Sequence, residues 1–166
     1  MEDLYGQQEV DRTSLGVFKP RKIHDLAVSG DTDKWKPAFE AALRQQRLWE
    51  NRKASREPPR KVPYKFHYHF ECDDEHCGRK HQMMIEDWEV GALYWNCIDD
   101  GANPPEAAAK VKQKFLDQLC SLERDTHFFV GTILAHPKSW VVIGVFWPKA
   151  AIERSAPDAS GRLFDY

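Results

Sequence analysis

The residues best suited to chemistry lie between His67 and His81, in the run HYHFECDDEHCGRKH. This run holds four of the seven histidines and two of the four cysteines. The spacing Cys72-x4-Cys77-x3-His81 brings two sulfur ligands and one imidazole within reach of a single tight loop. Cysteine and histidine in such a pattern are typical ligands of tetrahedral zinc. The sequence therefore predicts a zinc knuckle made by Cys72, Cys77 and His81.

A structural zinc ion takes four ligands, so one more side chain must come from elsewhere. Cys120 is the predicted fourth ligand, because it ends the strongest predicted helix and would join that helix to the knuckle. The alternatives that stay open are His69, Cys97 and His127. With only three protein ligands, water would fill the last position and the site could be catalytic. An ordinary metal-free hairpin loop also stays open, because C-x4-C is less specific than paired C-x2-C motifs.

A second set of titratable residues could support hydrolysis. His127 and His136 flank a predicted strand, and Asp87 and Glu89 open a predicted helix. A metal-dependent hydrolase or nuclease would arrange these groups around a three-ligand metal. Structural roles explain them better, since histidines at strand ends satisfy local hydrogen bonds and acids suit the first turn of a helix. No G-x-S-x-G, phosphate-binding glycine loop or dinucleotide fingerprint is present, so an enzyme is not favoured.

Charge is strongly polarised along the chain, although the net charge is only -2. Residues 44–65 carry eight basic and two acidic side chains, whereas residues 71–100 carry nine acidic and two basic ones. A basic strip with aromatic neighbours is typical of surfaces that bind DNA or RNA. The residues predicted to contact nucleic acid are Arg52, Lys53, Arg56, Arg60 and Lys61. Alternatively, the strip pairs with the acidic segment or is a solvated loop.

Composition narrows the class of protein. No apolar stretch approaches the ~20 residues of a bilayer span, and the acidic, polar start is unlike a signal peptide. We therefore expect a cytoplasmic protein with no membrane partner. Four cysteines, two of them beside histidines, favour metal-bound thiolates over disulfides. Six tryptophans are more than a small core needs, which indicates a protein partner.

The elements that must position the knuckle follow from hydrophobic periodicity. Residues 62–71 alternate with a period of two, which predicts a strand with its aromatic side chains on one face. Residues 80–86 predict an antiparallel return strand, so the ion would close the hairpin and fix its register. From the helix that follows, Trp88, Leu93 and Trp95 are expected to be available to the core.

The remaining elements complete a small α+β domain. A short strand is expected near Val17–Val28, with Pro20 keeping it at a sheet edge. A second hairpin is expected at residues 126–134 and 139–147, and its second arm, apolar on both faces, should be central in the sheet. Helices are expected near residues 35–49, 87–96 and 105–120. The last should begin with a capping box at Asn103.

We therefore predict a single domain with a mostly antiparallel sheet, built from two hairpins packed against about three helices, with the zinc knuckle at one hairpin. Residues 1–16 are expected to be a flexible N-terminus. The domain should span residues 17–148, and an extended C-terminal tail should follow at 149–166.

Several motifs resemble a family of small bacterial proteins of unknown function. They are PYKFHYHFECDDEHC, DWE, KVKQKFLDQLC, DTHFFVG and HPKSWVVIGVFWP, and they cover about half the chain, roughly residues 62–148. The family pattern resembles K-F-x-Y-x-F-x-C-x4-C-x2-H, D-W-E, D-T-H-F-F-V-G-N and H-P-x-S-F. The matching residues here are Cys72, Cys77, His81, Asp87, Trp88, Glu89, Asp125, His127 and His136. This chain places His81 one residue further on and has Thr132 where the family carries asparagine.

The resemblance implies a bacterial origin and strengthens the metal site, but it supplies no reaction. The sequence thus favours a zinc-stabilised adaptor or accessory module that contacts nucleic acid or a nucleic-acid-processing protein. A metal-dependent hydrolase or nuclease and a purely protein-binding subunit of a complex are the alternatives.

Overall fold

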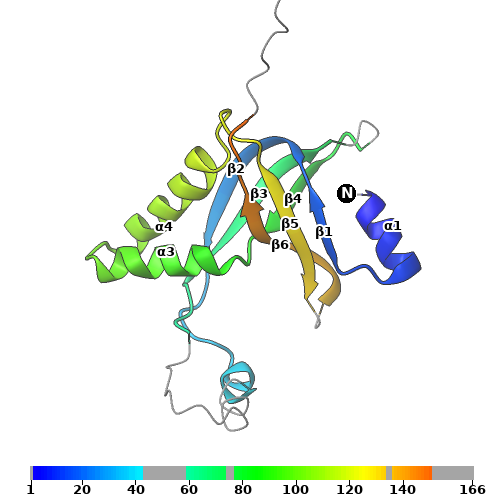
Figure 1. Cartoon of the computed structure of the whole chain (residues 1–166). Coiled ribbons are helices and arrows are strands. Elements are labelled where there is room, and N and C mark those ends of the chain that lie inside the picture. Colours follow the sequence, from blue (N-terminus) through cyan, green and yellow to red (C-terminus); the bar gives the residue numbers. More distant parts are fainter. Residues whose placement is uncertain (1, 43–58, 74–76, 134–135, 151–166) are drawn as a thin grey trace, which may run out of the picture.

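The computed structural model describes residues 2–42, 59–73, 77–133 and 136–150. Its strands form two three-stranded antiparallel sheets (Figure 1). The first sheet, in the order β1-β5-β6, contains β1 (Leu15–Phe18), β5 (His127–Ile133) and β6 (His136–Phe146). The second, in the order β2-β3-β4, contains β2 (Pro20–Gly30), β3 (Tyr64–Cys72) and β4 (Lys80–Met84). The predicted class, a small domain of antiparallel sheet and helices, is confirmed.

The two sheets close into one barrel. β1 and β2 are separated only by Lys19, so one stretch of chain pairs with β5 in the first sheet and with β3 in the second. At the opposite side, Ile85 forms a parallel bridge with Val142 of β6. The Glu86 amide donates to the Val142 carbonyl at 2.7 Å. The contacts therefore run β2-β3-β4-β6-β5-β1 and return to β2.

β3 supplies the centre of the core. Phe66, Tyr68, Phe70 and Cys72 are all buried, while the residues between them are more exposed. The rings of Phe70 and Phe128 meet edge to face at 5.6 Å. This confirms the predicted strand and its buried aromatic face, because alternation places every second side chain inside.

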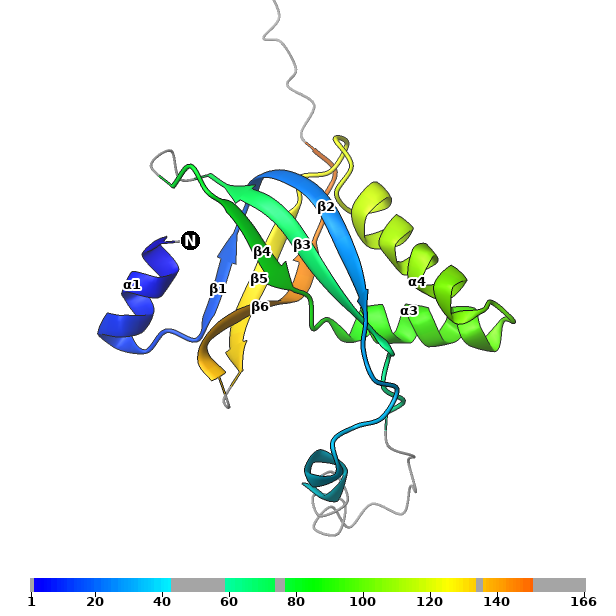
Figure 2. The same cartoon turned by 180° about the vertical axis from the view of Figure 1, so that it is seen from behind.

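Two helices and a π-helical turn lie together on one side of the barrel (Figures 1 and 2). They are α3 (Trp88–Asp99), α4 (Pro104–Lys112) and η1 (Gln113–Gln118). The predicted capping box begins α4: the Asn103 side chain accepts from the Glu106 amide at 3.0 Å, and the Glu106 carboxylate accepts from the Asn103 amide at 3.1 Å. These bonds satisfy backbone amides that the first turn leaves without helical partners.

The N-terminal region, predicted as a flexible segment at residues 1–16, contains a helix. Glu2–Asp11 form helix α1, which lies on the other side of the barrel from α3 and α4 (Figure 2). Leu4 packs against the core, and a Cβ on Gly16 would lie 2.6 Å from its Cδ2 atom. A larger residue at position 16 would therefore require the end of the Leu4 side chain to shift.

The strand predicted near Val17–Val28 is longer than expected. It consists of β1 and β2, which add a third strand to each predicted hairpin. Pro20 is the first residue of β2, at the edge of its sheet, where a missing amide is tolerated.

The second hairpin is confirmed, but the central position predicted for its second arm is wrong. Within its own three-stranded sheet β5 is the middle strand and β6 lies at the edge, where the bridge from Ile85 to Val142 joins it to the end of β4. The outward apolar residues Ile143 and Phe146 of β6 are exposed, as is Phe129 on the central strand β5.

Trp88 also differs from its prediction, because 78% of it is exposed. The buried residues of α3 are Val90, Tyr94 and Cys97, and Trp88 lies off that stripe. Of the helix predicted at 35–49, residues 37–42 are helical and the remainder lies outside the described residues. The predicted tail lies outside them from residue 151. No helix in the described ranges has the length and apolar character to cross a bilayer.

Candidate metal centre and aromatic pocket

The β3–β4 hairpin brings the three predicted metal ligands together. Cys72 is the last residue of β3, Cys77 lies in the turn, and His81 is the second residue of β4. His81 pairs directly with Phe70, so its side chain shares the inward face with Phe70 and Cys72. Gly78 has a φ of 53°, a left-handed conformation that glycine adopts without strain and that helps the chain turn back.

The donor atoms have the spacing that a small cation requires. Nε2 of His81 lies 3.2 Å from Sγ of Cys77 and 3.3 Å from Sγ of Cys72, and all three donor atoms lie within 4.8 Å of one another. Ligand atoms around tetrahedral zinc are about 3.5–3.8 Å apart, given its usual bond lengths. Both cysteines are buried and His81 is partly buried. The residues present therefore fit a metal ion of this class.

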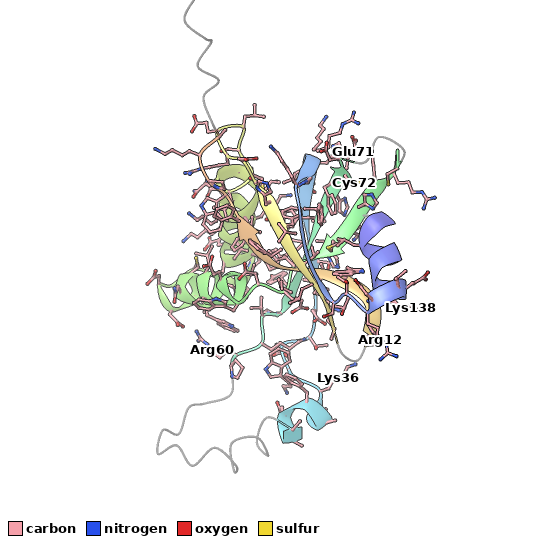
Figure 3. The ribbon with its side chains drawn as sticks, turned by 45° about the vertical axis from the view of Figure 1, so that its right-hand side comes forward. Arg12, Lys36, Arg60, Glu71, Cys72 and Lys138 are labelled. Atoms are coloured by element: carbon pink, nitrogen blue, oxygen red, sulfur yellow. The ribbon has the colours of Figure 1, made fainter. Side chains whose placement is uncertain are left out.

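Neighbouring contacts hold the hairpin ends in place. The ring of His81 stacks on Phe70 with centroids 5.4 Å apart. Beside Cys72, the carboxylate of Glu71 pairs with Nε2 of His24 at 2.8 Å, which ties β2 to β3. This hydrogen bond to His24 lowers the pKa of Glu71. Figure 3 places Glu71 and Cys72 at the same end of the strands.

Cys120, the predicted fourth ligand, lies elsewhere. Its Sγ atom donates to the Phe115 carbonyl at 3.1 Å and is 3.9 Å from the Tyr68 hydroxyl. Burial raises the pKa of the Cys120 thiol to about 11, so it is protonated at neutral pH. In the described part of the chain, the group of donors contains only Cys72, Cys77 and His81. Cys97, His69 and His127 are likewise not members.

The proposed hydrolytic residues are not brought together. His127 pairs with Phe146 at one end of the β5–β6 hairpin, whereas His136 pairs with Ile133 at the other end. Asp87 is the N-cap of α3 and accepts from the Glu89 amide at 2.9 Å. Asp87 and Glu89 thus occupy the structural positions that a helix first turn favours.

The basic strip is partly neutralised by acids. Arg60 donates to both carboxylate oxygens of Asp99, at 2.9 and 2.7 Å, and its guanidinium lies 4.0 Å from the centre of the Trp95 ring. Lys61 pairs with Asp31 at 2.9 Å. The Arg60–Asp99 pair joins the basic strip to the acidic segment, one of the alternatives that the sequence left open. The other predicted nucleic-acid contacts, Arg52, Lys53 and Arg56, lie outside the described residues.

Sequence reasoning missed a pocket of about 510 Å³, which we call the aromatic pocket. It lies where the connection between β2 and β3 leaves and re-enters the barrel, next to the start of α3. The two ends of this connection are joined by the Asp31 amide, which donates to the Pro63 carbonyl at 2.8 Å. The lining of the pocket includes Asp31, Trp35, Glu86, Asp87, Trp88 and Trp95. The high tryptophan content was the signal in the sequence.

The pocket carries both charge signs. The hydrogen bond from Lys61 lowers the pKa of Asp31. Partial desolvation of the Glu86 carboxyl raises its pKa, and nearby Lys65 opposes this effect. A wall of indole rings with separated charged groups can hold a planar ligand that carries polar edges.

A second surface is the outer side of the β1–β5–β6 sheet, which we call the outer apolar face. Its exposed residues are Leu15, Val17, Phe129, Ile143 and Phe146. Val17 pairs with Phe129, and the rings of Phe129 and Phe146 lie 6.4 Å apart, so the residues are contiguous. Exposed apolar surface of this kind marks interaction sites.

Comparison with known proteins gives one result. Searches of the curated proteins and of the solved structures find no match. A family model described as "Domain of unknown function (DUF8757)" matches residues 1–165. The resemblance to an uncharacterised family is thereby confirmed over nearly the whole chain. The chain belongs to the family of this domain of unknown function, DUF8757.

Proposed function

We propose that this protein is a non-catalytic module that binds single-stranded nucleic acid on a β-barrel stabilised by a structural zinc ion. The observation that carries the proposal is the aromatic pocket at the base of the basic connection between β2 and β3. Stacking of bases on aromatic side chains, combined with positive charge along the backbone, is the general mode of single-strand binding.

The order of strand contacts supports this proposal. A long first strand, here β1 with β2, contacts both β3 and β5, the helices intervene between β4 and β5, and β4 meets β6 in parallel. This arrangement resembles the oligonucleotide- and oligosaccharide-binding barrel. Such barrels bind ligands on their second and third strands and on the loop between the first and second. The equivalent parts here are β3, β4 and the connection that borders the aromatic pocket.

Charge supports it as well. Residues 43–58 carry five basic and two acidic side chains. The chain on either side of them, at Trp35 and Pro59, lines the pocket. Arg60 and Lys61 fix the described end of this connection through Asp99 and Asp31.

We assign zinc to the metal site because two buried sulfurs and an imidazole form a soft donor set that suits zinc better than magnesium or calcium. Its role is structural. β3 has nine residues, so the site at Cys72 lies about 26 Å from the start of the strand at 3.3 Å per residue. Figure 3 places Cys72 and Arg60 at opposite ends of the molecule.

The test is fluorescence anisotropy with labelled single-stranded DNA and RNA at about 50 and 200 mM salt. We expect binding that weakens with salt. Replacing Arg52, Lys53 and Arg56 together by glutamine should reduce the salt slope by about 2. The matched control replaces three other basic residues, Lys110, Lys114 and Lys138, by glutamine and should leave the slope nearly unchanged. No binding of either nucleic acid at the lower salt would remove the proposal.

The outer apolar face favours a second candidate, self-association of the chain. The exposed parts of its five residues present about 500–600 Å² of apolar surface. This area is at the upper end of the range for the largest apolar patch on a monomeric protein. Two copies packed face to face would bury about 1,000–1,200 Å², the lower end for a stable interface. Light scattering should then show a dimer that becomes monomeric when Phe129 and Phe146 are replaced by serine. A monomer at high concentration would exclude it.

A further inference from the structure

Trp88 is the tryptophan of the aromatic pocket that is available to a ligand. The indole N–H of Trp35 donates to the Pro59 carbonyl at 2.8 Å, and Lys61 lies 5.9 Å from its ring centre. The ring of Trp95 is covered by the Arg60 guanidinium. These two rings are fixed parts of the wall. Trp88 is mostly exposed, and among the described residues no cation covers its ring.

Glu86 is the carboxylate of the pocket that is available to a ligand. Asp31 already accepts from Lys61 and from the Thr32 amide, and Asp87 accepts from the Glu89 amide. Within the described ranges, the Glu86 carboxylate has no hydrogen-bond or ion-pair partner, while its own amide is fixed to Val142. Both oxygens of a positioned carboxylate can therefore accept from a ligand.

The positions of Glu86 and Trp88 are fixed by different elements. The Glu86 backbone is held at the bridge between β4 and β6, and Trp88 is the first residue of α3, whose N-cap is Asp87. Both residues line the same pocket and only one residue separates them, so a ring stacked on Trp88 shares that pocket with the Glu86 carboxylate. A rigid backbone at both Glu86 and Trp88 holds their side chains in fixed positions, which is needed to distinguish one base from another.

We propose that Trp88 and Glu86 form a nucleobase subsite that prefers guanine, an inference that rests on the proposed single-strand binding. Guanine presents two adjacent donors, N1–H and the N2 amino group, which match the two oxygens of one carboxylate. Bidentate pairs of this kind are stronger and more selective than single bonds. Adenine and cytosine offer an amino group beside an acceptor nitrogen. Thymine and uracil offer one N–H between two carbonyl oxygens. In each case a carboxylate gains at most one hydrogen bond and is repelled by the neighbouring acceptor.

The test uses protein of the full sequence and short oligothymidylates that carry one central guanine, adenine, cytosine or inosine. Inosine lacks only the N2 amino group, so it removes one of the two donors without changing the stacking ring. We expect guanine to bind about tenfold more tightly than thymine, and inosine to lose most of that gain.

Three variants separate the contributions. Glu86→Gln should remove the preference for guanine while binding of oligothymidylate persists. Glu89→Gln, a matched change at an exposed carboxylate three residues along, should keep the preference. Trp88→Ala should weaken binding of every oligonucleotide, and Trp88→Phe should restore much of it, because stacking is tolerant of base identity.

The outcomes distinguish this inference from the function on which it rests. Binding with equal affinity for all bases, or a guanine preference that survives Glu86→Gln, would overturn the subsite and leave single-strand binding in place. Absence of oligonucleotide binding at low salt would overturn both. Folding of each variant is checked by circular dichroism and by its metal content, because the metal centre lies at the other end of the barrel.

Discussion

The ring of His81 stacks on the ring of Phe70, the residue directly opposite it across the β3–β4 hairpin. The inner side of His81 is thus fixed by the core, and its Nε2 atom faces the sulfurs of Cys72 and Cys77. Packing in the barrel and placement of the metal ligands are therefore parts of the same arrangement. Removal of an ion bound by these residues should therefore disturb the packing of the core as well as the turn.

The first prediction concerns metal content. Cys72→Ser, Cys77→Ser or His81→Ala should each lower the zinc content of purified protein from about one ion per chain to a small fraction, because each removes one of three clustered donors. Cys120→Ser should leave the content unchanged, since Cys120 lies beside Phe115 and Tyr68. Plasma mass spectrometry measures the ratio. Loss of zinc in Cys120→Ser would show that Cys120 is a ligand after all.

The second prediction concerns metal removal. Binding energy at a structural zinc site contributes to folding, so a strong chelator should destabilise the protein. We expect the free energy of unfolding to fall by about 3 kcal/mol, which corresponds to a fall of about 10 °C in melting temperature for a chain of this size. Scanning calorimetry with and without chelator measures the shift. The His81→Ala variant is the control and should melt at the same temperature in both conditions.

The third prediction concerns the start of α4. Asn103→Ala should reduce the free energy of unfolding by about 1 kcal/mol, because it removes the acceptor that caps the Glu106 amide. Asn103→Asp keeps an acceptor and should be nearly neutral. Urea denaturation measures both. Equal stability of Asn103→Ala and the original chain would mean that tertiary contacts alone hold this helix start.

The fourth prediction concerns Glu86 and pH. Its pKa is raised in the folded state by partial desolvation, so the folded protein binds this proton more readily than the unfolded chain does. Stability contributed by this group is therefore complete below the unfolded pKa and falls as pH rises through the folded pKa. Glu86→Gln should be slightly more stable than the original chain at neutral pH, with no advantage in acid.

Urea titrations of both proteins, from pH values below the unfolded pKa of Glu86 up to neutral pH, provide the measurement. Protonation of Glu86 should also affect the proposed base preference. Protonated Glu86 cannot accept two hydrogen bonds, so selectivity for guanine should decline as pH falls through the folded pKa of Glu86. A preference that is independent of pH down to the acid limit of folding would contradict the assigned role of this carboxylate.

Local features of the fold could be predicted where sequence pattern and packing agree. β3 alternates strictly, so its buried aromatic residues were identifiable, and the capping box at Asn103 has a signature in side-chain chemistry. The three clustered metal ligands lie within ten residues of one another, so the spacing itself predicted their proximity. Such features depend on few long-range contacts.

Features that depend on distant pairing could not be predicted. The division of β1 and β2 between two sheets follows from pairing with β5 and β3, which are far away in sequence. The exposure of Trp88 depends on which face of α3 meets the barrel. The position of Cys120 depends on the π-helical turn before it, in which the usual helical spacing no longer holds.

The seam between the two halves of the barrel has one further consequence. The amide of Glu86 fastens β4 to β6, while the carboxylate of the same residue borders the pocket. The backbone N–H of Glu86 is therefore sensitive both to a ligand in the pocket and to separation of β4 from β6. The exchange rate of this amide proton with deuterated solvent would show whether a bound molecule tightens the closure of the barrel, because a tighter seam exchanges more slowly.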